Sequence, residues 1–473
     1  MSLADLLPPH GDDLAVHAGG RDHTWSELAD RAADIACALA DAGVGPGAPV
    51  GVLLPNGMDL VAALFAVWRA GGAVVPLNPR LTATELDHVI ADVDPAAFVT
   101  APPGDDRLAG RARPVVVVDG DRVATRPGRA GDRRLDPGVA LVSFTSGTTG
   151  RPRPVPLDHE RVLGLLDTVI GSLRTRPGDR PPMPNLVPVS LSLWAGIYQV
   201  LFAFRVGAPV VVMPRFTTGG FADLVRRFAI RSTVLPPAAM VMLCDDPAVT
   251  DLAPLRYVRS ISSPLSPLQA RRFRDRFGIS VLNCYGQTEL GGEVVGWSAA
   301  DSREFGATKL GAVGRPHAGV EVRTGEAGEL WVRTAGVVRA ADLGDRLTAD
   351  GWLRTGDVAT IDGDGFVWIE GRLSDMINRG GLKVHPGEVE EVLRLAPAVA
   401  DAAVAAVPDD RLGEVPWAWC VPADPGAGLP PDGELAALCR EHLAPYKVPV
   451  RFVAVPELPR NEAGKVLRRA LGT

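Results

Sequence analysis

Short apolar runs alternate with amphipathic segments over most of the chain before Lys309. The runs predict strands at Val50–Leu54, Ala73–Pro76, Ala140–Phe144, Pro209–Met213, Thr233–Leu235 and Val281–Asn283. Between them, Thr24 and Thr82 each stand three residues before a glutamate, which predicts two capped helix starts, and Met58–Ala70 predicts a third helix. Because short strands that alternate with helices usually form parallel sheets, the pattern predicts an α/β domain with helices on both faces of its sheets.

The pattern changes after about Lys309. Strand-like runs separated by Gly- and Asp-containing turns then occupy Val320–Arg323, Gly328–Arg333, Asp357–Ile361 and Gly365–Glu370. They predict a β-rich subdomain over residues 310–371, at the end of a large N-terminal domain over residues 1–371. Strand and helix patterns alternate again over residues 372–473, which predicts a small α+β domain.

Two further stretches, Arg107–Arg134 and Arg174–Pro184, are rich in Arg, Gly, Pro and Asp. Such clusters are typical of surface loops, so both stretches are predicted to be loops. No segment repeats with the period of a solenoid protein.

The composition is that of a soluble globular protein, with 473 residues, 46% hydrophobic and 22% charged. A net charge of −7 disfavours an electrostatic nucleic-acid binder. The five cysteines are odd in number and include no C-x-x-C pair, so we expect no disulfide framework and no zinc site. The residues near Met1 lack the basic and apolar segments of a signal peptide, and no run of about 18 apolar residues occurs. We therefore expect a cytoplasmic protein without a membrane span or a nucleic-acid partner.

The first candidate for chemistry is Thr145-Ser-Gly-Thr-Thr-Gly150, which follows a predicted strand. Its small residues let the backbone approach an anion, and its hydroxyls and N–H groups can surround phosphate oxygens. It is not a Walker loop, because no G-x-x-x-x-G-K-[ST] pattern occurs. Taken alone, such a run is also typical of a plain surface loop.

Four later segments carry similar candidates. They are Asn283-Cys-Tyr-Gly-Gln-Thr-Glu289, Trp352-Leu-Arg-Thr-Gly-Asp357, Glu370-Gly-Arg-Leu-Ser-Asp-Met-Ile-Asn378 and Pro459-Arg-Asn-Glu-Ala-Gly-Lys465. Each is compatible with an ordinary polar turn, and a lone lysine near a C-terminus is usually only exposed. Their order and spacing therefore matter more than any single segment.

The ordered set resembles the signatures of the adenylate-forming superfamily, which includes acyl-CoA synthetases, peptide-synthetase adenylation domains and firefly-type luciferases. Its patterns are T-S-G-T-T-G-x-P-K-G-V followed by a histidine, Y-G-x-T-E, W-x-x-T-G-D, G-R-x-D-D-x-I and P-R-x-x-x-G-K. His159 stands where the histidine is expected. The chain is most similar to a stand-alone acyl-CoA synthetase, and the resemblance covers about residues 20–470. It implies that the C-terminal domain is mobile.

The resemblance implies a site for ATP and Mg²⁺. Tyr285 would face adenine, Asp357 would accept the ribose hydroxyls, Thr288 would contact the α-phosphate and Glu289 would bind Mg²⁺. Lys465 would bridge the attacking carboxylate and the α-phosphate. The full set of implied nucleotide contacts is Thr145, Ser146, Gly147, Thr148, Thr149, Gly150, Arg153, Ser262, Ser263, Tyr285, Gly286, Gln287, Asp357 and Arg372.

The sequence departs from the family pattern in three places. Arg153 replaces the lysine of the phosphate loop, and Pro154 replaces the next glycine, so this part of the loop should be stiffer. The hinge residue, usually Asp or Lys, is Ser374. In the segment that the family uses for thioester formation, Gly380 and Gly381 are expected to line the coenzyme A channel.

The acid substrate is less well defined by the sequence. The segment 187–196 corresponds to a helix start that often lines the acid pocket, and Ser192 and Trp194 lie in it. Its largely apolar character favours a hydrophobic or bulky acid. The alternative is that Trp194 belongs to the core.

The predicted activity is that of an ATP-dependent carboxylate–CoA ligase, which forms an acyl-AMP and pyrophosphate and then an acyl-CoA and AMP. A second interpretation is an acyl-AMP ligase that loads a carrier protein or performs only one half-reaction. A third, of a different class, is a catalytically silent nucleotide-binding regulator.

Overall fold

The computed structural model describes residues 1–108, 110–120, 122–146, 152–172, 182–336, 338, 340–461 and 464–471. Gly147, Thr148, Thr149 and Gly150 of the predicted phosphate loop lie outside the described residues. So does most of the predicted loop at 174–184.

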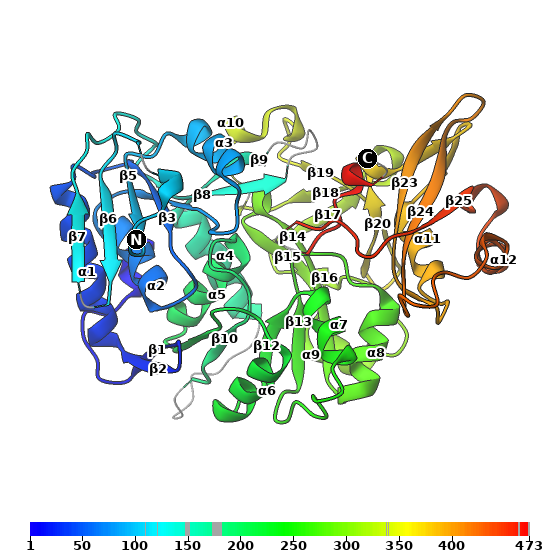
Figure 1. The fold of residues 1–473 in the computed structure, drawn as a ribbon, viewed down its shortest axis with the longest axis horizontal. Helices are drawn as coiled ribbons and strands as arrows, with labels where there is room; N and C mark the ends of the chain where they lie inside the picture. Colours follow the sequence, from blue (N-terminus) through cyan, green and yellow to red (C-terminus); the bar gives the residue numbers. More distant parts are fainter. Residues whose placement is uncertain are drawn as a thin grey trace.

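The strands in the described part of the chain form five sheets, which follow one another across the molecule (Figure 1). The sheet nearest the N-terminus has the order β7-β6-β5-β3-β4-β8-β9. Its strands are β3 (Pro49–Leu53), β4 (Ala73–Pro76), β5 (Ala97–Thr100), β6 (Val115–Asp119), β7 (Arg122–Arg126), β8 (Val139–Ser146) and β9 (Pro152–Asp158). The inner pairs are parallel and the two edge pairs antiparallel, which confirms parallel-rich sheets in the N-terminal domain.

Two more mixed sheets lie beside it. One has the order β10-β11-β1-β2, and its strands are β1 (Leu14–Ala18), β2 (Arg21–Thr24), β10 (Asn185–Val187) and β11 (Val210–Val212). The other has the order β12-β13-β14-β15-β16, and its strands are β12 (Ser232–Leu235), β13 (Tyr257–Ser260), β14 (Ser280–Gln287), β15 (Gly292–Gly296) and β16 (Arg315–Pro316). Parallel pairing ends at β14, which pairs antiparallel with β15.

Helices cover these sheets. They are α1 (Trp25–Asp41), α2 (Met58–Arg69), α3 (Ala83–Val93), α4 (His159–Ser172), α5 (Trp194–Arg205), α6 (Thr218–Arg227), α7 (Pro237–Asp245), α8 (Pro267–Phe277) and α9 (Ala299–Phe305). The predicted capping boxes are present at α1 and α3, where Thr24 and Thr82 bond reciprocally with Glu27 and Glu85. Helix α2 is apolar all round, and the residues from Leu60 to Trp68 are all buried in the core that the sheets share.

The predicted β-rich subdomain is an antiparallel sheet of β17 (Glu321–Thr324), β18 (Glu329–Arg333), β19 (Leu353–Ile361) and β20 (Val367–Arg372). A short helix, α10 (Ala340–Leu343), lies between β18 and β19.

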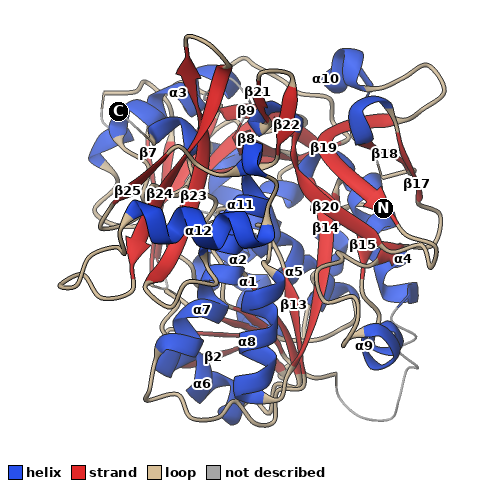
Figure 2. Ribbon diagram, turned by 90° about the vertical axis from the view of Figure 1, so that its right-hand side faces the viewer, coloured by secondary structure: helices blue, strands red, loops and turns tan. Residues whose placement is uncertain are grey.

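The small C-terminal domain has a core of its own, as the α+β prediction requires. Its sheet has the order β22-β21-β24-β23, with β25 paired to β24. Its elements are β21 (Ile377–Arg379), β22 (Leu382–Val384), α11 (Pro386–Leu393), β23 (Val399–Asp409), β24 (Gly413–Pro422), α12 (Asp432–His442) and β25 (Arg451–Ala454). Both helices pack on the sheet through buried residues that include Leu393, Val404 and Leu435 (Figure 2).

The predicted surface loop over Arg107–Arg134 is wrong. Strands β6 and β7 lie within it and extend the first sheet, and Val116 and Val118 are buried. The four consecutive valines from Val115 strongly favour a strand, but the Arg- and Pro-rich flanks concealed that signal.

All five cysteines are free, and Cys37 is exposed. Among the described residues, no group of three metal-ligating side chains occurs. No helix in the described ranges is long and apolar enough to span a lipid bilayer.

Candidate functional site

A cleft of about 3360 Å³ runs between the N-terminal sheets, the β17–β20 sheet and the C-terminal domain. It brings together side chains from segments that are far apart in the sequence. The predicted site residues that line it are Arg153, Ser192, Trp194, Ser262, Ser263, Tyr285, Gly286, Gln287, Thr288, Glu289, Asp357, Arg372, Ser374 and Lys465. Gly380 and Gly381 are not among the lining residues.

Asp357, on β19, is the centre of a hydrogen-bonded cluster in this cleft. Its Oδ1 pairs with Arg372 Nε at 2.8 Å across the β19–β20 register. Its Oδ2 accepts from the Tyr285 hydroxyl at 2.7 Å and from Gln287 Nε2 at 2.6 Å. The carboxylate is therefore a buried anion that is fully paired, with only 5% of the residue exposed.

Tyr285 is fixed by this cluster in a way that the sequence did not predict. Burial and the neighbouring Asp357 carboxylate raise the pKa of Tyr285, so the phenol stays neutral and donates. One edge of the ring is thereby anchored, and the ring lines the cleft.

Glu289 lies in a single helical turn, Thr288–Leu290, directly after β14. Its Oε1 pairs with Arg346 Nη1 at 2.8 Å, and Arg346 Nη2 donates to Gln287 Oε1 at 3.2 Å. Sequence reasoning missed Arg346, because a single arginine between β18 and β19 carries no motif. Arg346 places a cation beside Glu289, the predicted magnesium ligand.

Gly286 is required by close packing of two strands. A Cβ atom there would lie 1.9 Å from the carbonyl oxygen of Gly292 on the paired strand β15. No side chain can be accommodated without moving one backbone, and the moved strands would carry Tyr285 and Gln287 with them.

We therefore expect Gly286→Ala to lower the free energy of unfolding by about 1–3 kcal/mol, as overpacking usually does. Denaturant unfolding followed by tryptophan fluorescence measures the loss. Gly219→Ala is the matched control, because Gly219 lies in α6 with no atom within 4 Å of the added Cβ. Equal stability of the two variants would contradict the packing argument.

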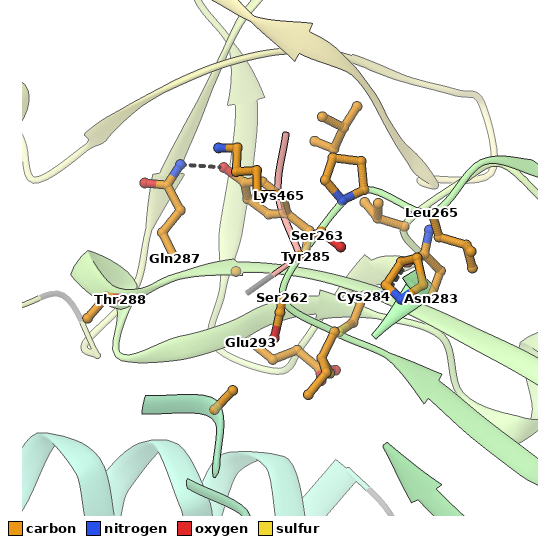
Figure 3. A pocket seen from close by; sticks show the side chains of 18 of the residues that line it. Ser262, Ser263, Leu265, Asn283, Cys284, Tyr285, Gln287, Thr288, Glu293 and Lys465 are labelled. Atoms are coloured by element: carbon orange, nitrogen blue, oxygen red, sulfur yellow. Dashed lines mark hydrogen bonds between the residues drawn. The ribbon is translucent and has the colours of Figure 1, made fainter. Parts of the chain in front are cut away.

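Lys465 reaches the same cleft from the C-terminal domain. Its backbone N–H donates to Asn461 Oδ1 at 2.9 Å, which holds the loop that presents it. Burial and the Arg372 guanidinium lower the pKa of the Lys465 ammonium, while Asp357 and Asp375 oppose that shift. Figure 3 shows the side chain beside Tyr285 and Ser263. The lysine is thus next to the Asp357 cluster and not on the open surface.

Ser262 and Ser263 form the tight turn that follows β13. Ser262 has a φ of 73°, in the left-handed region that favours glycine, and Ser263 N–H donates to the carbonyl of Ile261 at 3.0 Å. The turn holds both small side chains at the cleft wall, where the resemblance implied purine contacts (Figure 3).

The first two residues of the predicted phosphate loop belong to a strand, and a second strand begins at Pro152. Thr145 and Ser146 belong to β8, and they pair with Arg153 and Pro152 of β9. The strand pair continues to Pro154, opposite Phe144. Arg153 is exposed at the cleft, so its guanidinium is available to an anionic ligand.

Trp194 and Ser192 lie at the start of α5. Trp194 is only 8% exposed, and its Nε1 donates to the Gly291 carbonyl at 2.9 Å, yet it also lines the cleft. It therefore combines a core position with a pocket wall. Ser192 Oγ is 2.6 Å from Ser190 Oγ, which fixes the turn before the helix.

Ser374 and the glycine pair lie at the junction with the C-terminal domain. Ser374 is exposed, and its hydroxyl donates to Asp375 Oδ1 at 3.1 Å. Gly380 and Gly381, with φ values of 60° and 92°, form the two-residue turn between β21 and β22.

Comparison with known proteins assigns both the N-terminal and the C-terminal part of the chain to one kind of enzyme. Residues 7–340 match the family described as AMP-binding enzyme, and residues 388–465 match the AMP-binding enzyme C-terminal domain. The chain belongs to the AMP-binding enzyme family. The resemblance that the motifs indicated is confirmed.

Relatives from this family match over nearly their whole length. The chain is 36% identical to a methyl-dioxo-octahydro-indenyl-propanoyl:CoA ligase of Mycobacterium tuberculosis, over 99% of this chain and 96% of the relative. It is 33% identical to a feruloyl-CoA synthase of an Amycolatopsis species, over 98% and 95%. These full-length matches identify the AMP-binding enzyme as an AMP-forming acid–CoA ligase.

A solved structure of the o-succinylbenzoate CoA synthetase of Bacillus subtilis, in complex with its acyl-adenylate intermediate, superposes with a TM-score of 0.85. The two are 25% identical, and the match covers 100% of this chain and 97% of that one. Another structure of the same synthetase holds ATP and a magnesium ion. The fold of this AMP-binding enzyme is therefore that of a two-domain adenylate-forming protein.

Proposed function

We propose that this ligase activates its acid in the cleft around Asp357 and Lys465, with ATP as the nucleotide. The observation that carries the proposal is that the buried carboxylate of Asp357 and the half-buried ammonium of Lys465 lie close together in the cleft, although the two residues are 108 positions apart in the sequence. Asp357 accepts the ribose hydroxyls, with Arg372 as its fixed partner. Tyr285, Ser262 and Ser263 contact the base.

Lys465 stabilises the charge that develops during attack of the acid on the α-phosphorus. Its ammonium lies near both Asp357 and Arg372. In the proposed nucleotide site it is therefore beside the ribose, to which the α-phosphate is attached. Positioning and charge stabilisation supply most of the catalysis in phosphoryl-type transfer. Gly286 lets β14 pack closely on β15 at this wall, and Thr288 donates its hydroxyl to the α-phosphate.

The donor set fits a magnesium ion held mainly by phosphate. Glu289 offers one carboxylate, and Mg²⁺ commonly binds through one or two carboxylates together with phosphates and water. When bound, the ion neutralises phosphate charge. Arg346 and Arg153 both line the cleft and add cationic contacts to the phosphates. Residues 145–150 complete the phosphate site in this proposal.

The second half-reaction requires rotation of the C-terminal domain, residues 372–473, about Ser374. In the present arrangement Lys465 is in the cleft while Gly380 and Gly381 are outside its lining, as the adenylation step needs. Rotation would withdraw Lys465 and bring the glycine turn to the cleft, where its lack of side chains admits the coenzyme A thiol arm.

The acid lies between α5 and the β14–β15 pair. Trp194, Ile261 and Val313 give this part of the cleft an apolar wall, which favours an acid with a hydrophobic or bulky body. The mycobacterial relative is named for a bulky bicyclic acid, which agrees with this choice. Ser192 lines the cleft just before α5.

Acid-dependent exchange of pyrophosphate into ATP tests the proposal. We expect exchange with a subset of ring-containing acids and, once coenzyme A is added, a product with the mass of an acyl-CoA. Coenzyme A and a holo carrier protein are offered side by side, so that the thiol acceptor is identified by the mass of the product. Nucleotide binding without exchange for any acid in a broad screen would contradict the proposal and favour a regulator.

A further inference from the structure

A buried charged group lies beyond the nucleotide site, on the β13–β15 strands. Arg259 Nη1 pairs with Glu293 Oε1, and His317 Nε2 lies 2.8 Å from the same oxygen. Arg259 Nη2 also donates to the Trp297 carbonyl at 3.1 Å. The Glu293 and His317 side chains are only 13% and 10% exposed. The acid pocket is therefore less apolar than the sequence predicted.

The hydrogen bonds of this group leave one oxygen of Glu293 without an N–H or O–H donor. Arg259 and His317 both contact Oε1, the Cys284 thiol also contacts the carboxylate, and among the described residues no N–H or O–H group donates to Oε2. Burial acts to raise the pKa of Glu293, but Arg259 and His317 outweigh it and lower that pKa, so the group is a carboxylate. Glu293 lines the cleft and offers a charged acceptor to whatever occupies it.

Tyr198, on α5, faces the same space. Its hydroxyl is buried and has no hydrogen-bond partner among the described residues, although the residue lines the cleft. Burial and the nearby Glu293 carboxylate raise the pKa of Tyr198, so the phenol is neutral and can donate. Burying a hydroxyl without a partner is unfavourable, so such groups usually face a ligand or a water.

The surrounding glycines show that this is a closely packed site. A Cβ on Gly296 would lie within 2.3 Å of Glu293 Oε1, and one on Gly292 would be 3.9 Å from the Tyr198 ring and 3.7 Å from Trp194 Nε1. Figure 3 shows Glu293 on the other side of Ser262 and Cys284 from Lys465. An acid whose carboxylate meets Lys465 would thus point its far end toward Glu293 and Tyr198.

We infer that the preferred substrate is a carboxylic acid with a hydrophobic body and a hydroxyl group at its far end, held between Glu293 and Tyr198. The inference rests on the proposed function and names its substrate class. A hydroxyl donates to the carboxylate and accepts from the phenol, so it satisfies both free positions at once. A second carboxylate would face Glu293 and be repelled, and an ether could accept but not donate.

Matched acids test this inference directly. In the pyrophosphate-exchange assay, 3-(4-hydroxyphenyl)propanoate and trans-4-hydroxycyclohexanepropanoate are each compared with the acid that lacks the hydroxyl and with its methyl ether. We expect kcat/KM to be about 10- to 100-fold higher for at least one hydroxylated acid than for its two analogues, because each analogue leaves a buried polar group unpaired.

Tyr198→Phe removes only the hydroxyl of the phenol. It should reduce that preference by about tenfold, because kcat/KM falls for the hydroxylated acid that loses its donor. Tyr446→Phe, in the C-terminal domain, is the control and should keep the full preference. Glu293→Gln keeps the shape of the side chain and should abolish the preference over the methyl ether.

The outcomes distinguish failure of the inferred substrate class from failure of the proposed function. Equal kcat/KM for hydroxylated and hydroxyl-free acids, or an unchanged preference in Tyr198→Phe, overturns the inference. Activation of other acids with none of the hydroxylated ones overturns it too and leaves the proposed function standing. No exchange with any acid overturns both.

Discussion

Lys465→Ala is expected to lower the rate of acyl-adenylate formation by about 10²- to 10³-fold or more, which is typical of removing one group that stabilises transition-state charge. The reason is geometric. The ammonium lies beside Asp357 and Arg372 at the cleft, and the other lysine among the described residues that line the cleft, Lys447, is paired with Glu388. Single-turnover formation of acyl-AMP, measured by rapid quench, gives the rate.

The same variant should form acyl-CoA at the normal rate from a supplied acyl-AMP, because rotation of the C-terminal domain withdraws Lys465 before the thiol attacks. Lys383→Ala, on the exposed hairpin strand β22, is the control for acyl-AMP formation. Equal loss in both half-reactions would rule out separate arrangements for the two steps.

Asp357→Asn is expected to raise the KM for ATP by about 10- to 100-fold, because each of the two ribose hydrogen bonds loses its charged acceptor. The amide has the shape of the carboxylate, so Tyr285 can still donate to its oxygen. The change also leaves the Arg372 guanidinium without its partner, which weakens the attraction that holds β19 to β20 at this point. Initial rates at varied ATP measure the effect.

A nucleotide analogue distinguishes a ribose contact from a general distortion. The natural enzyme should discriminate against 2′,3′-dideoxy-ATP by a similar factor, whereas Asp357→Asn should barely distinguish the two nucleotides. Asp350→Asn, at an exposed site of the same subdomain, should behave as the natural enzyme. Full discrimination by Asp357→Asn would mean that the carboxylate does not contact the ribose.

Much of the fold follows from local patterns in the sequence. The capping boxes at Thr24 and Thr82 and the apolar runs before residue 300 predict elements that the structure contains, because local hydrogen bonding and alternation determine them. The valine strand from Val115 was missed, because composition averaged over a long Arg-rich stretch hides a short run. Hydrophobic periodicity also does not predict the order of the strands in a sheet, because strand pairing depends on contacts between residues that are far apart in the chain.

The candidate site was predictable only where a motif marks it. Tyr285, Asp357 and Lys465 come from ordered signatures, and the cleft brings them together. Arg346 and Tyr198 have no signature, because the fold alone pairs Arg346 with Glu289 and places the Tyr198 hydroxyl at the cleft. Residues that the fold brings together from distant parts of the chain are therefore the ones that sequence patterns describe least.

The paired state of Asp357 has a consequence for turnover. Tyr285 and Gln287 donate to one oxygen of its carboxylate, and Arg372 pairs with the other. In the proposed reaction these donors of the chain itself pair with Asp357 when AMP departs, so the carboxylate is not left as an unpaired buried charge.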